Sequence, residues 1–231
     1  MVSPVGADIA DQLSRLARSL EHEHDLQATL DGIVHAAVDT VPGAQHASIS
    51  VIQHRREVRT QASTGELSNA VDVAQYETGQ GPCLDTLYEK DTERLENLQT
   101  DPRWPAFTAR ARELGVGSML SVQLYVEGDD LGALNLVNTE PYGFDEEDEP
   151  VALLFASHAA VAMAGAQAQA ELRTGMRTRD IIGQAKGILM ERFSITADQA
   201  FALLVRVSQS TNRKLADIAE ELTMSRQLPP H

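Results

Sequence analysis

The chain has 231 residues, of which 42% are hydrophobic, and its formal net charge is −15. This length allows one or two domains with sizeable cores, and since there is no apolar run of about 18 residues we expect no membrane-spanning helix. The single cysteine, Cys83, excludes an internal disulfide and a cysteine-based metal cluster, and the N-terminus does not resemble a signal peptide, so a cytoplasmic protein is expected.

The first part of the chain predicts two helices and then a sheet. Apolar residues recur with helical spacing over residues 9–20 and 26–41, and Pro42-Gly43 ends the second run. Alternation over residues 46–55 predicts a strand, with residues 57–64 as its hairpin partner.

In the next part of the chain, an irregular segment is followed by a short helix and two strands. Residues 76–104 are rich in Gly, Pro and Asp and are expected to lack regular structure. A short helix is predicted over residues 104–115, followed by two strands within residues 121–138 that a turn at Gly128-Asp129 joins. Helices packed on a mostly antiparallel sheet give an α+β fold of the kind found in sensor domains.

A long alanine-rich helix is predicted from Asp148 onward. Acidic residues and Pro150 mark its start, and no breaker occurs until Phe193-Ser194. A helix of roughly 40 residues would span roughly 60 Å, so we expect a partner helix and hence a homodimer. The alternative is a helix that lies on its own sheet. The small-residue seam expected at the dimer contact comprises Ala159, Ala162, Ala166 and Ala170.

Two short helices follow and complete a three-helix module. Thr196 and Gln199 fit a capping box at the start of the first. Thr211 or Asn212 is the expected cap of the second. The apolar stripes that hold the module together comprise Ala200, Leu204, Val207, Leu215, Ile218, Ala219 and Leu222.

This module has the opposite charge to the rest of the chain. Residues 173–226 hold nine Lys/Arg and six Asp/Glu, a net charge of +3, whereas the remainder carries −18. Arg179 and Lys186 lie two helical turns apart beside Gly183 and Gly187, on a surface that a sugar-phosphate chain can approach closely. The alternative for the glycines is tight helix–helix packing.

A second candidate anion site lies at the start of the last helix. Arg213 and Lys214 are expected in its first turn, where the helix dipole disfavours cations unless an anion binds there. Arg206 and Ser208 on the preceding helix are placed to join them. The alternative is ordinary solvated charge.

The pattern of this module resembles the ANTAR domain, a three-helix RNA-binding module of bacterial transcription antitermination. The resemblance covers residues 173–223 and is carried by Arg179, Ala185-Lys186-Gly187, Leu189-Met190, Ala200-Phe201, Leu204, Arg206, Ser208, Leu215 and Ala219. It implies that a dimer binds paired stem-loops in leader RNA and prevents a terminator hairpin. It also implies that RNA is contacted by Arg179, Lys186, Gly187, Arg206, Ser208, Asn212, Arg213 and Lys214.

Two features bear on the kind of nucleic acid. Sequence-specific RNA readers usually act on single-stranded loops, through aromatic side chains that this module lacks, since Phe193 and Phe201 are expected in its core. A DNA-binding helix-turn-helix is the competing interpretation, because residues 216–227 resemble its first helix and turn. The sequence ends at residues 228–231 without a recognition helix, which disfavours that interpretation.

Residues 24–167 resemble a GAF domain, a ligand-sensing α+β fold. The resemblance is carried by residues 46–51, 75–84, 101–105 and 131–136. It implies a small-molecule ligand of unknown identity and no fixed cofactor. Leu84 stands where a third glycine often follows Gly79-x-Gly81, which argues against a cyclic nucleotide. No acidic receiver-type pocket is evident, so control by phosphorylation is not expected.

Cys83 allows two interpretations. On a loop near Arg103 its thiol would sense oxidation if its pKa were lowered, whereas a buried structural cysteine is the alternative. The same fold hosts methionine-sulfoxide reductases, but their chemistry needs a resolving cysteine that this chain lacks. Neither a catalytic nor a metal site is expected. The candidate ligand-binding residues are Tyr76, Cys83, Arg103 and Trp104.

The sequence therefore predicts a non-enzymatic cytoplasmic regulator that binds stem-loop RNA as a dimer under the control of a sensor domain. The alternative is a DNA-binding or single-cysteine redox-responsive regulator. The expected organisation is an N-terminal helix (1–23), the GAF-like domain (24–167), the linking and dimerising helix (148–178), the ANTAR-like domain (173–223) and a tail (224–231).

Overall fold

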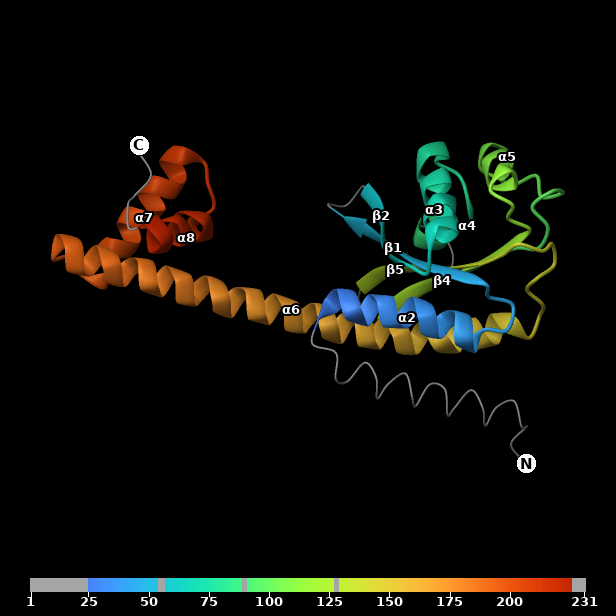
Figure 1. Cartoon of the computed structure of the whole chain (residues 1–231), viewed down its shortest axis with the longest axis horizontal. Helices are drawn as coiled ribbons and strands as arrows, with labels where there is room; N and C mark the ends of the chain where they lie inside the picture. Colours follow the sequence, from blue (N-terminus) through green and yellow to red (C-terminus); the bar gives the residue numbers. More distant parts are fainter. Residues whose placement is uncertain (1–24, 54–56, 89–90, 127–128, 226–231) are drawn as a thin grey trace, which may run out of the picture. The chain divides into compact units, whose positions relative to one another are not determined.

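The computed structural model describes residues 25–53, 57–88, 91–126 and 129–225. The chain divides into two compact units, residues 1–167 and 168–231, and one helix, α6, contributes to both (Figure 1). The helix predicted over residues 9–20 lies outside the described residues.

A five-stranded antiparallel sheet forms the centre of the first unit. Its strands are β1 (His46–Gln53), β2 (Glu57–Ser63), β3 (Thr92–Leu95), β4 (Ser118–Val126) and β5 (Asp129–Asn138), in the order β2-β1-β5-β4-β3. Both predicted hairpins are confirmed, since β1 pairs with β2 and β4 pairs with β5, each antiparallel. The predicted α+β class is confirmed.

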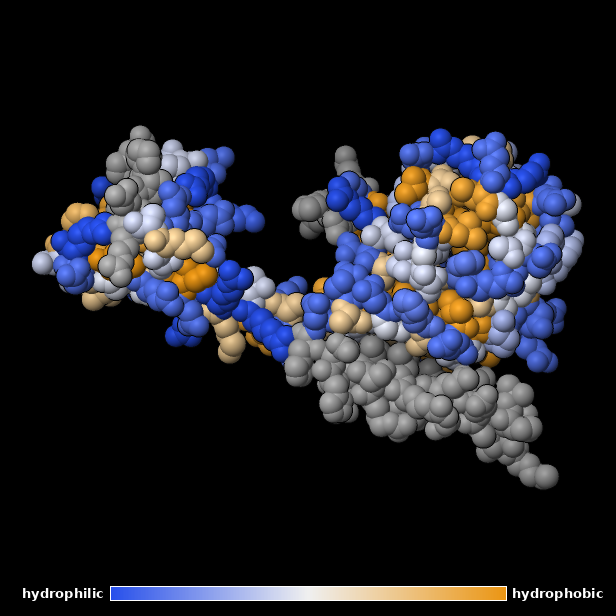
Figure 2. All heavy atoms as spheres, in the orientation of Figure 1, coloured by the Kyte–Doolittle hydropathy of each residue, from blue (hydrophilic) through white to orange (hydrophobic). Residues whose placement is uncertain are grey.

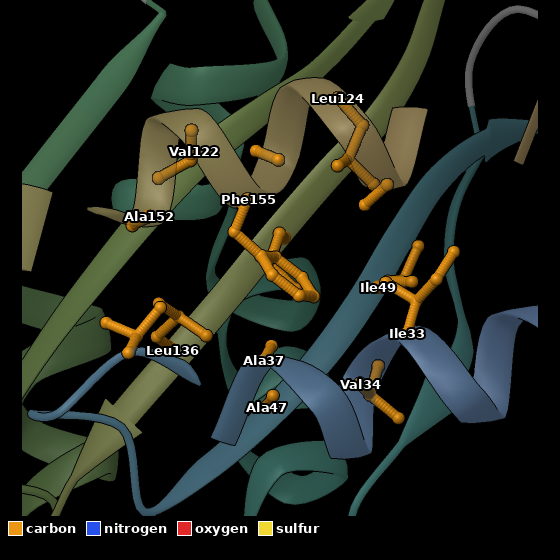
Figure 3. Packing of buried hydrophobic residues seen from close by; sticks show 14 of the residues in the cluster. Ile33, Val34, Ala37, Ala47, Ile49, Val122, Leu124, Leu136, Ala152 and Phe155 are labelled. Carbon is orange, nitrogen blue, oxygen red and sulfur yellow. The ribbon is translucent and has the colours of Figure 1, made fainter. Parts of the chain in front are cut away.

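Helices cover both faces of this sheet. On one face lie α2 (Leu26–Thr40) and the first turns of α6 (Asp148–Phe193), and on the other lie α3 (Glu66–Thr78), α4 (Pro82–Tyr88) and α5 (Pro105–Glu113) (Figure 1). Ile33 and Ala37 of α2 meet Phe155 of α6 over Ile49 and Leu136 of the sheet, and all five are buried (Figure 3). The opposite face of the sheet carries a second hydrophobic cluster, which includes Met119 and Val137, and beside it the polar groups described below.

The expectation that residues 76–104 lack regular structure is wrong. The end of α3, all of α4 and β3 lie within this segment. Gly79 and Gly81, with φ of 63° and 137°, form the turn between the two helices. Because α4 has seven residues and β3 has four, neither is long enough to show a periodic pattern among so many turn residues.

The long helix α6 runs for 46 residues and ends at Phe193, as predicted, before Ser194 with φ of 50°. By length and composition alone, α6 would suffice to cross a membrane, although no membrane-spanning helix was expected from the sequence. A third of its most apolar 18-residue stretch is buried within the protein. The predicted alanine seam is partly occupied, because Ala159 is buried and Ala162 packs against the core of the first unit. The first turns of α6 thus lie on their own sheet.

The second unit consists of the last turns of α6 with α7 (Ala197–Thr211) and α8 (Leu215–Ser225). The capping box at Thr196 and Gln199 is present. Asn212 ends α7 rather than capping α8, since its φ is 51° and its N–H donates to Ser208 O. The buried core comprises Ala185, Leu189, Ala200, Leu204, Val207, Ile218, Ala219 and Leu222.

Candidate nucleic-acid interface

One open groove in the second unit contains the first pair of predicted cations. It has a volume of about 420 Å³ and lies between α6 and the start of α7. Hereafter it is called the Lys186 groove. Its lining residues are Gly175, Thr178, Arg179, Ile182, Gly183, Lys186 and Phe201.

Helical periodicity explains why these side chains share a face. Ala185 and Leu189 are fully buried beneath α7 and α8, which turns the side of α6 that carries Arg179, Gly183 and Lys186 outward. Gly187 is exposed further round the same side. The structure thus brings together three of the predicted RNA-binding residues on one stretch of helix.

Packing within the chain does not explain the helical glycines. A Cβ atom built on Gly183 or on Gly187 would meet nothing within 4 Å. Each glycine nevertheless costs the helix about 1 kcal/mol relative to alanine. Within the described residues, tight packing between helices of the same chain therefore does not explain these glycines. The other explanation that the sequence offers is the close approach of a partner.

The phenylalanines differ from expectation. Phe193 is 50% exposed and Phe201 is 41% exposed, so their predicted place in the core is wrong. Ala200 and Leu204 occupy the buried stripe of α7, and Phe201 follows Ala200 by one position, which rotates its ring away from the core. Lys186 Nζ lies 5.9 Å from the centre of the Phe201 ring, within reach of a cation–π contact.

The second predicted cluster lies at the corner between α7 and α8. Arg213 and Lys214 precede α8 rather than forming its first turn, because Lys214 O accepts the N–H groups of Asp217 and Ile218 and so caps the helix. Arg213 pairs with Glu221 at 2.7 Å, and Ser208 Oγ donates to Arg213 O at 2.6 Å. These contacts hold the corner together internally.

Two cations of this corner remain available to a partner. Arg206 and Lys214 are exposed, and neither forms an ion pair with any residue in the described ranges. No residue of the corner lines the Lys186 groove. The eight predicted RNA-binding residues therefore form two sets, one on α6 and one on the last turns of α7 and the turn that leads into α8.

The four candidate ligand-binding residues of the first unit also separate into two pairs. Tyr76 packs beside Cys83 in one cluster, whereas Arg103 stacks on Trp104 in another, 4.2 Å from the ring centre. Trp104 is buried in a core cluster and its indole N–H donates to Asp85. Among the described residues, the predicted ligand set is therefore divided between two clusters.

Arg103 is held by acidic partners. Its guanidinium pairs with Glu93 and with Asp101, each at 2.6 Å. Although partial burial opposes the effect, hydrogen bonds from Arg103 hold the pKa of Asp101 below its usual value. These ion pairs therefore hold Arg103 in place in the loop that precedes α5, where it stacks on Trp104.

Cys83 is a buried cysteine of α4 and does not lie on a loop as expected. Burial raises the pKa of its thiol to about 12, and the nearby carboxyl of Asp72 acts in the same direction. The lowered pKa that a redox-sensing thiol requires is thus absent. The alternative interpretation of Cys83 as a structural residue fits these observations.

A buried polar cluster that the sequence did not reveal lies between the sheet and α3. Asp72 is fully buried and accepts hydrogen bonds from Thr60 Oγ1 at 2.8 Å and from Asn135 Nδ2 at 3.0 Å. Asn135 also donates to Ser50 Oγ, which is 2.6 Å from the hydroxyl of Tyr76. In sequence Asp72 looks like an ordinary charge on an amphipathic helix, and Asn135 within an apolar strand was the only signal.

Burial raises the pKa of Asp72 to about 6, against hydrogen bonds that lower it. The native state therefore binds this proton more tightly than the unfolded chain does. The contribution to stability is fully present below about pH 4 and is lost as the pH rises through about 6, and it amounts to about 3 kcal/mol. The neighbouring groups Tyr76 and Cys83 have raised pKa values and stay neutral over this range.

We therefore expect the unfolding free energy of the wild-type protein, relative to Asp72→Asn, to fall by up to about 3 kcal/mol between pH 4 and pH 7.5. Urea unfolding followed by the fluorescence of Trp104, the only tryptophan, measures the first unit alone. Taking the difference between the unfolding free energies of the wild type and the variant cancels the contributions of the other carboxyl groups. A difference that does not change with pH would contradict the raised pKa.

Comparison with known proteins identifies both parts of the chain. The model of the GAF domain matches residues 23–164, and the model of the ANTAR domain matches residues 170–222. No curated protein sequence matches the chain.

Solved structures share the fold of the first unit. The chain is similar to the GAF domains of phosphoenolpyruvate-protein phosphotransferases from Coxiella burnetii (19% identity, TM-score 0.56, 73% of this chain and 99% of that one) and from Acinetobacter (20%, 0.56, 74% and 99%). It is also similar to free methionine-R-sulfoxide reductase from Neisseria meningitidis in complex with its substrate (17%, 0.56, 72% and 95%). At these identities the likeness shows the fold alone.

Proposed function

Because the chain belongs to the GAF domain family and carries an ANTAR domain after it, we propose that it is a sensor-controlled transcription antitermination regulator that binds stem-loop RNA as a dimer. The ANTAR domain implies RNA-binding antitermination regulation, and the GAF domain implies a sensor. The observation that carries the proposal is the Lys186 groove, which presents Arg179, Lys186 and bare helix backbone to solvent.

The electrostatics support an RNA partner for the second unit. No carboxylate lines the Lys186 groove, and Arg206 and Lys214 add two exposed cations at the α7–α8 corner. The net charge of +3 over residues 173–226 contrasts with −18 elsewhere, so a polyanion is attracted to this unit and repelled by the rest.

The proposed dimer forms through α6. Its exposed apolar residues Leu154, Val161, Leu172 and Met176 lie at intervals of seven, eleven and four positions, which places them in one stripe on a helix. Val161, Leu172 and Met176 are each at least 66% exposed. A second copy of α6 would cover this stripe, while Ala159 stays packed on its own sheet.

The same helix provides the proposed route of control. Phe155 of α6 packs against the sheet of the sensor, and Lys186 lies on the same uninterrupted helix. A signal that changes the packing of α6 would change the spacing of two RNA-binding units in a dimer. Linked sites gain affinity from their effective concentration only when the geometry lets both bind, so such a change would switch binding.

We propose that the protein is not an enzyme and acts in the cytoplasm. Cys83 is its only cysteine and is buried with a raised pKa, so it supports neither a sulfoxide reductase nor a thiol sensor.

A competitive selection tests the function. The full chain is mixed with transcripts and duplex DNA fragments of the source genome at one moderate salt concentration, because charge-driven affinity depends on ionic strength. We expect enrichment of tandem stem-loops that overlap terminators, and loss of this enrichment in Lys186→Ala. Enrichment of duplex DNA instead would contradict the proposal and favour a DNA-binding regulator.

A further inference from the structure

The exposed ring of Phe201 is the feature of the Lys186 groove that cations and backbone do not explain. It lines the groove at the start of α7 and is 41% exposed, while its neighbour Ala200 is fully buried. Lys186 lies over the ring, so an aromatic face and a cation meet at one point. Such a pairing matches the two chemical parts of a nucleotide, a flat base and an anionic phosphate.

The backbone beside the ring is unusually bare. Gly175 and Gly183 both line the groove, and a Cβ atom on either would meet nothing within 4 Å. Two glycines that do not serve packing within the chain leave room for a flat ligand against the helix. The groove volume of about 420 Å³ falls within the range of small-molecule sites.

The charge of the groove favours a nucleotide over an apolar partner. Arg179 and Lys186 line it together with Phe201, and its lining includes no carboxylate. Arg179 forms no ion pair with any of the residues that the structure describes, so its guanidinium remains available to a phosphate. An apolar segment of a second chain would leave both cations without a counter-charge.

We propose that the Lys186 groove binds one unpaired nucleotide of an RNA loop, with its base stacked on Phe201 and its phosphates contacted by Arg179 and Lys186. The inference rests on the proposed RNA-binding function and adds which part of the RNA this groove contacts. A base within a duplex is already stacked on both sides, so only a loop or an end presents a free face. The groove therefore distinguishes loops from paired stems.

The experiment measures binding of the full chain to RNA hairpins that share one stem and carry a randomised loop, against the same stem as a closed duplex. We expect Phe201→Leu to lower affinity for the hairpins roughly tenfold without changing the salt dependence, because stacking involves no counterion release. Phe201→Tyr should retain affinity, since a ring remains. Phe193→Leu is the matched control, because Phe193 is exposed but does not line the groove.

A second variant tests the bare backbone. Gly183→Ala should weaken hairpin binding while the thermal unfolding midpoint of the protein stays the same or rises, because alanine favours the helix. Gln184→Ala, at the next exposed position outside the groove, is the control and should bind as the wild type does. Loss of binding with equal or greater stability separates a contact from a folding defect.

The contrary outcomes are distinct. If Phe201→Leu binds hairpins as the wild type does while Lys186→Ala does not, RNA binding stands and stacking on Phe201 is wrong. If Phe201→Leu or Gly183→Ala changes the sedimentation of the protein without RNA, a second copy of the chain occupies the groove and the inference fails. If the wild-type protein binds neither hairpin nor duplex RNA, the proposed function fails with it.

Discussion

Replacing Arg179 and Lys186 together by alanine is expected to lower RNA affinity roughly 100-fold at moderate salt, about tenfold for each phosphate contact. Both residues line the Lys186 groove and face solvent, so their loss does not disturb the core formed by Ala185 and Leu189. The slope of log affinity against log salt should become less steep by about 1.4, since each contact with single-stranded RNA contributes about 0.7.

The matched control for this double variant is Arg177→Ala. The Arg177 side chain is 75% exposed and pairs with Glu220 at 3.1 Å, and it does not line the groove. We expect its affinity to stay within about threefold of the wild type. An equal loss in Arg177→Ala would show that the effect is one of general charge rather than of the groove. A salt slope that does not change in the double variant would show that Arg179 and Lys186 do not contact phosphates.

The second large effect is expected at Gly132 in the central strand β5. Gly132 has φ of 152°, and a Cβ atom there would lie 2.2 Å from the carbonyl oxygen of Ser50 on β1. Neither strand can move away, because β5 lies between β1 and β4 in the sheet. Gly132→Ala should therefore destabilise the first unit by more than about 3 kcal/mol, a large part of the stability of a typical domain.

Urea unfolding followed by Trp104 fluorescence measures this loss. Gly65→Ala is the control, because Gly65 precedes α3 in extended backbone with nothing within 4 Å of an added Cβ. That variant should change the unfolding free energy by less than about 1 kcal/mol. If Gly132→Ala unfolds at the same urea concentration as Gly65→Ala, the close approach of β5 to β1 is wrong.

Much of the fold follows from sequence patterns that are long enough to be periodic. The strands β1 and β4 show alternation and β5 shows an apolar run, over eight to ten residues, and the end of α6 is marked by the change at Phe193-Ser194. In contrast, α4 and β3 are short and lie among glycines and prolines. The composition of this segment is typical of turns, and for that reason it was expected to lack regular structure. Length does not account for every element, because α3 has 13 residues and was not predicted from the sequence.

The candidate site was predictable only where one helix carries it. Arg179, Lys186 and Gly187 are grouped by helical spacing alone, but the contribution of Phe201 depends on how α7 packs against α6. From the sequence alone, an aromatic residue next to Ala200 is expected to lie in the core, and only the structure shows which way its ring points. Asp72 and Asn135 are 63 positions apart, so no local pattern indicates their hydrogen bond.

The burial of the single cysteine has a practical consequence. Cys83 is fully buried with a pKa of about 12, so at neutral pH it will not react with maleimide reagents. A cysteine introduced on the exposed side of α6, as in Glu171→Cys, will then carry a spin label alone in the otherwise native protein. If the proposed dimer forms, the distance between labels on its two protomers, measured by electron paramagnetic resonance, will report how far apart the helices lie with and without a candidate signal.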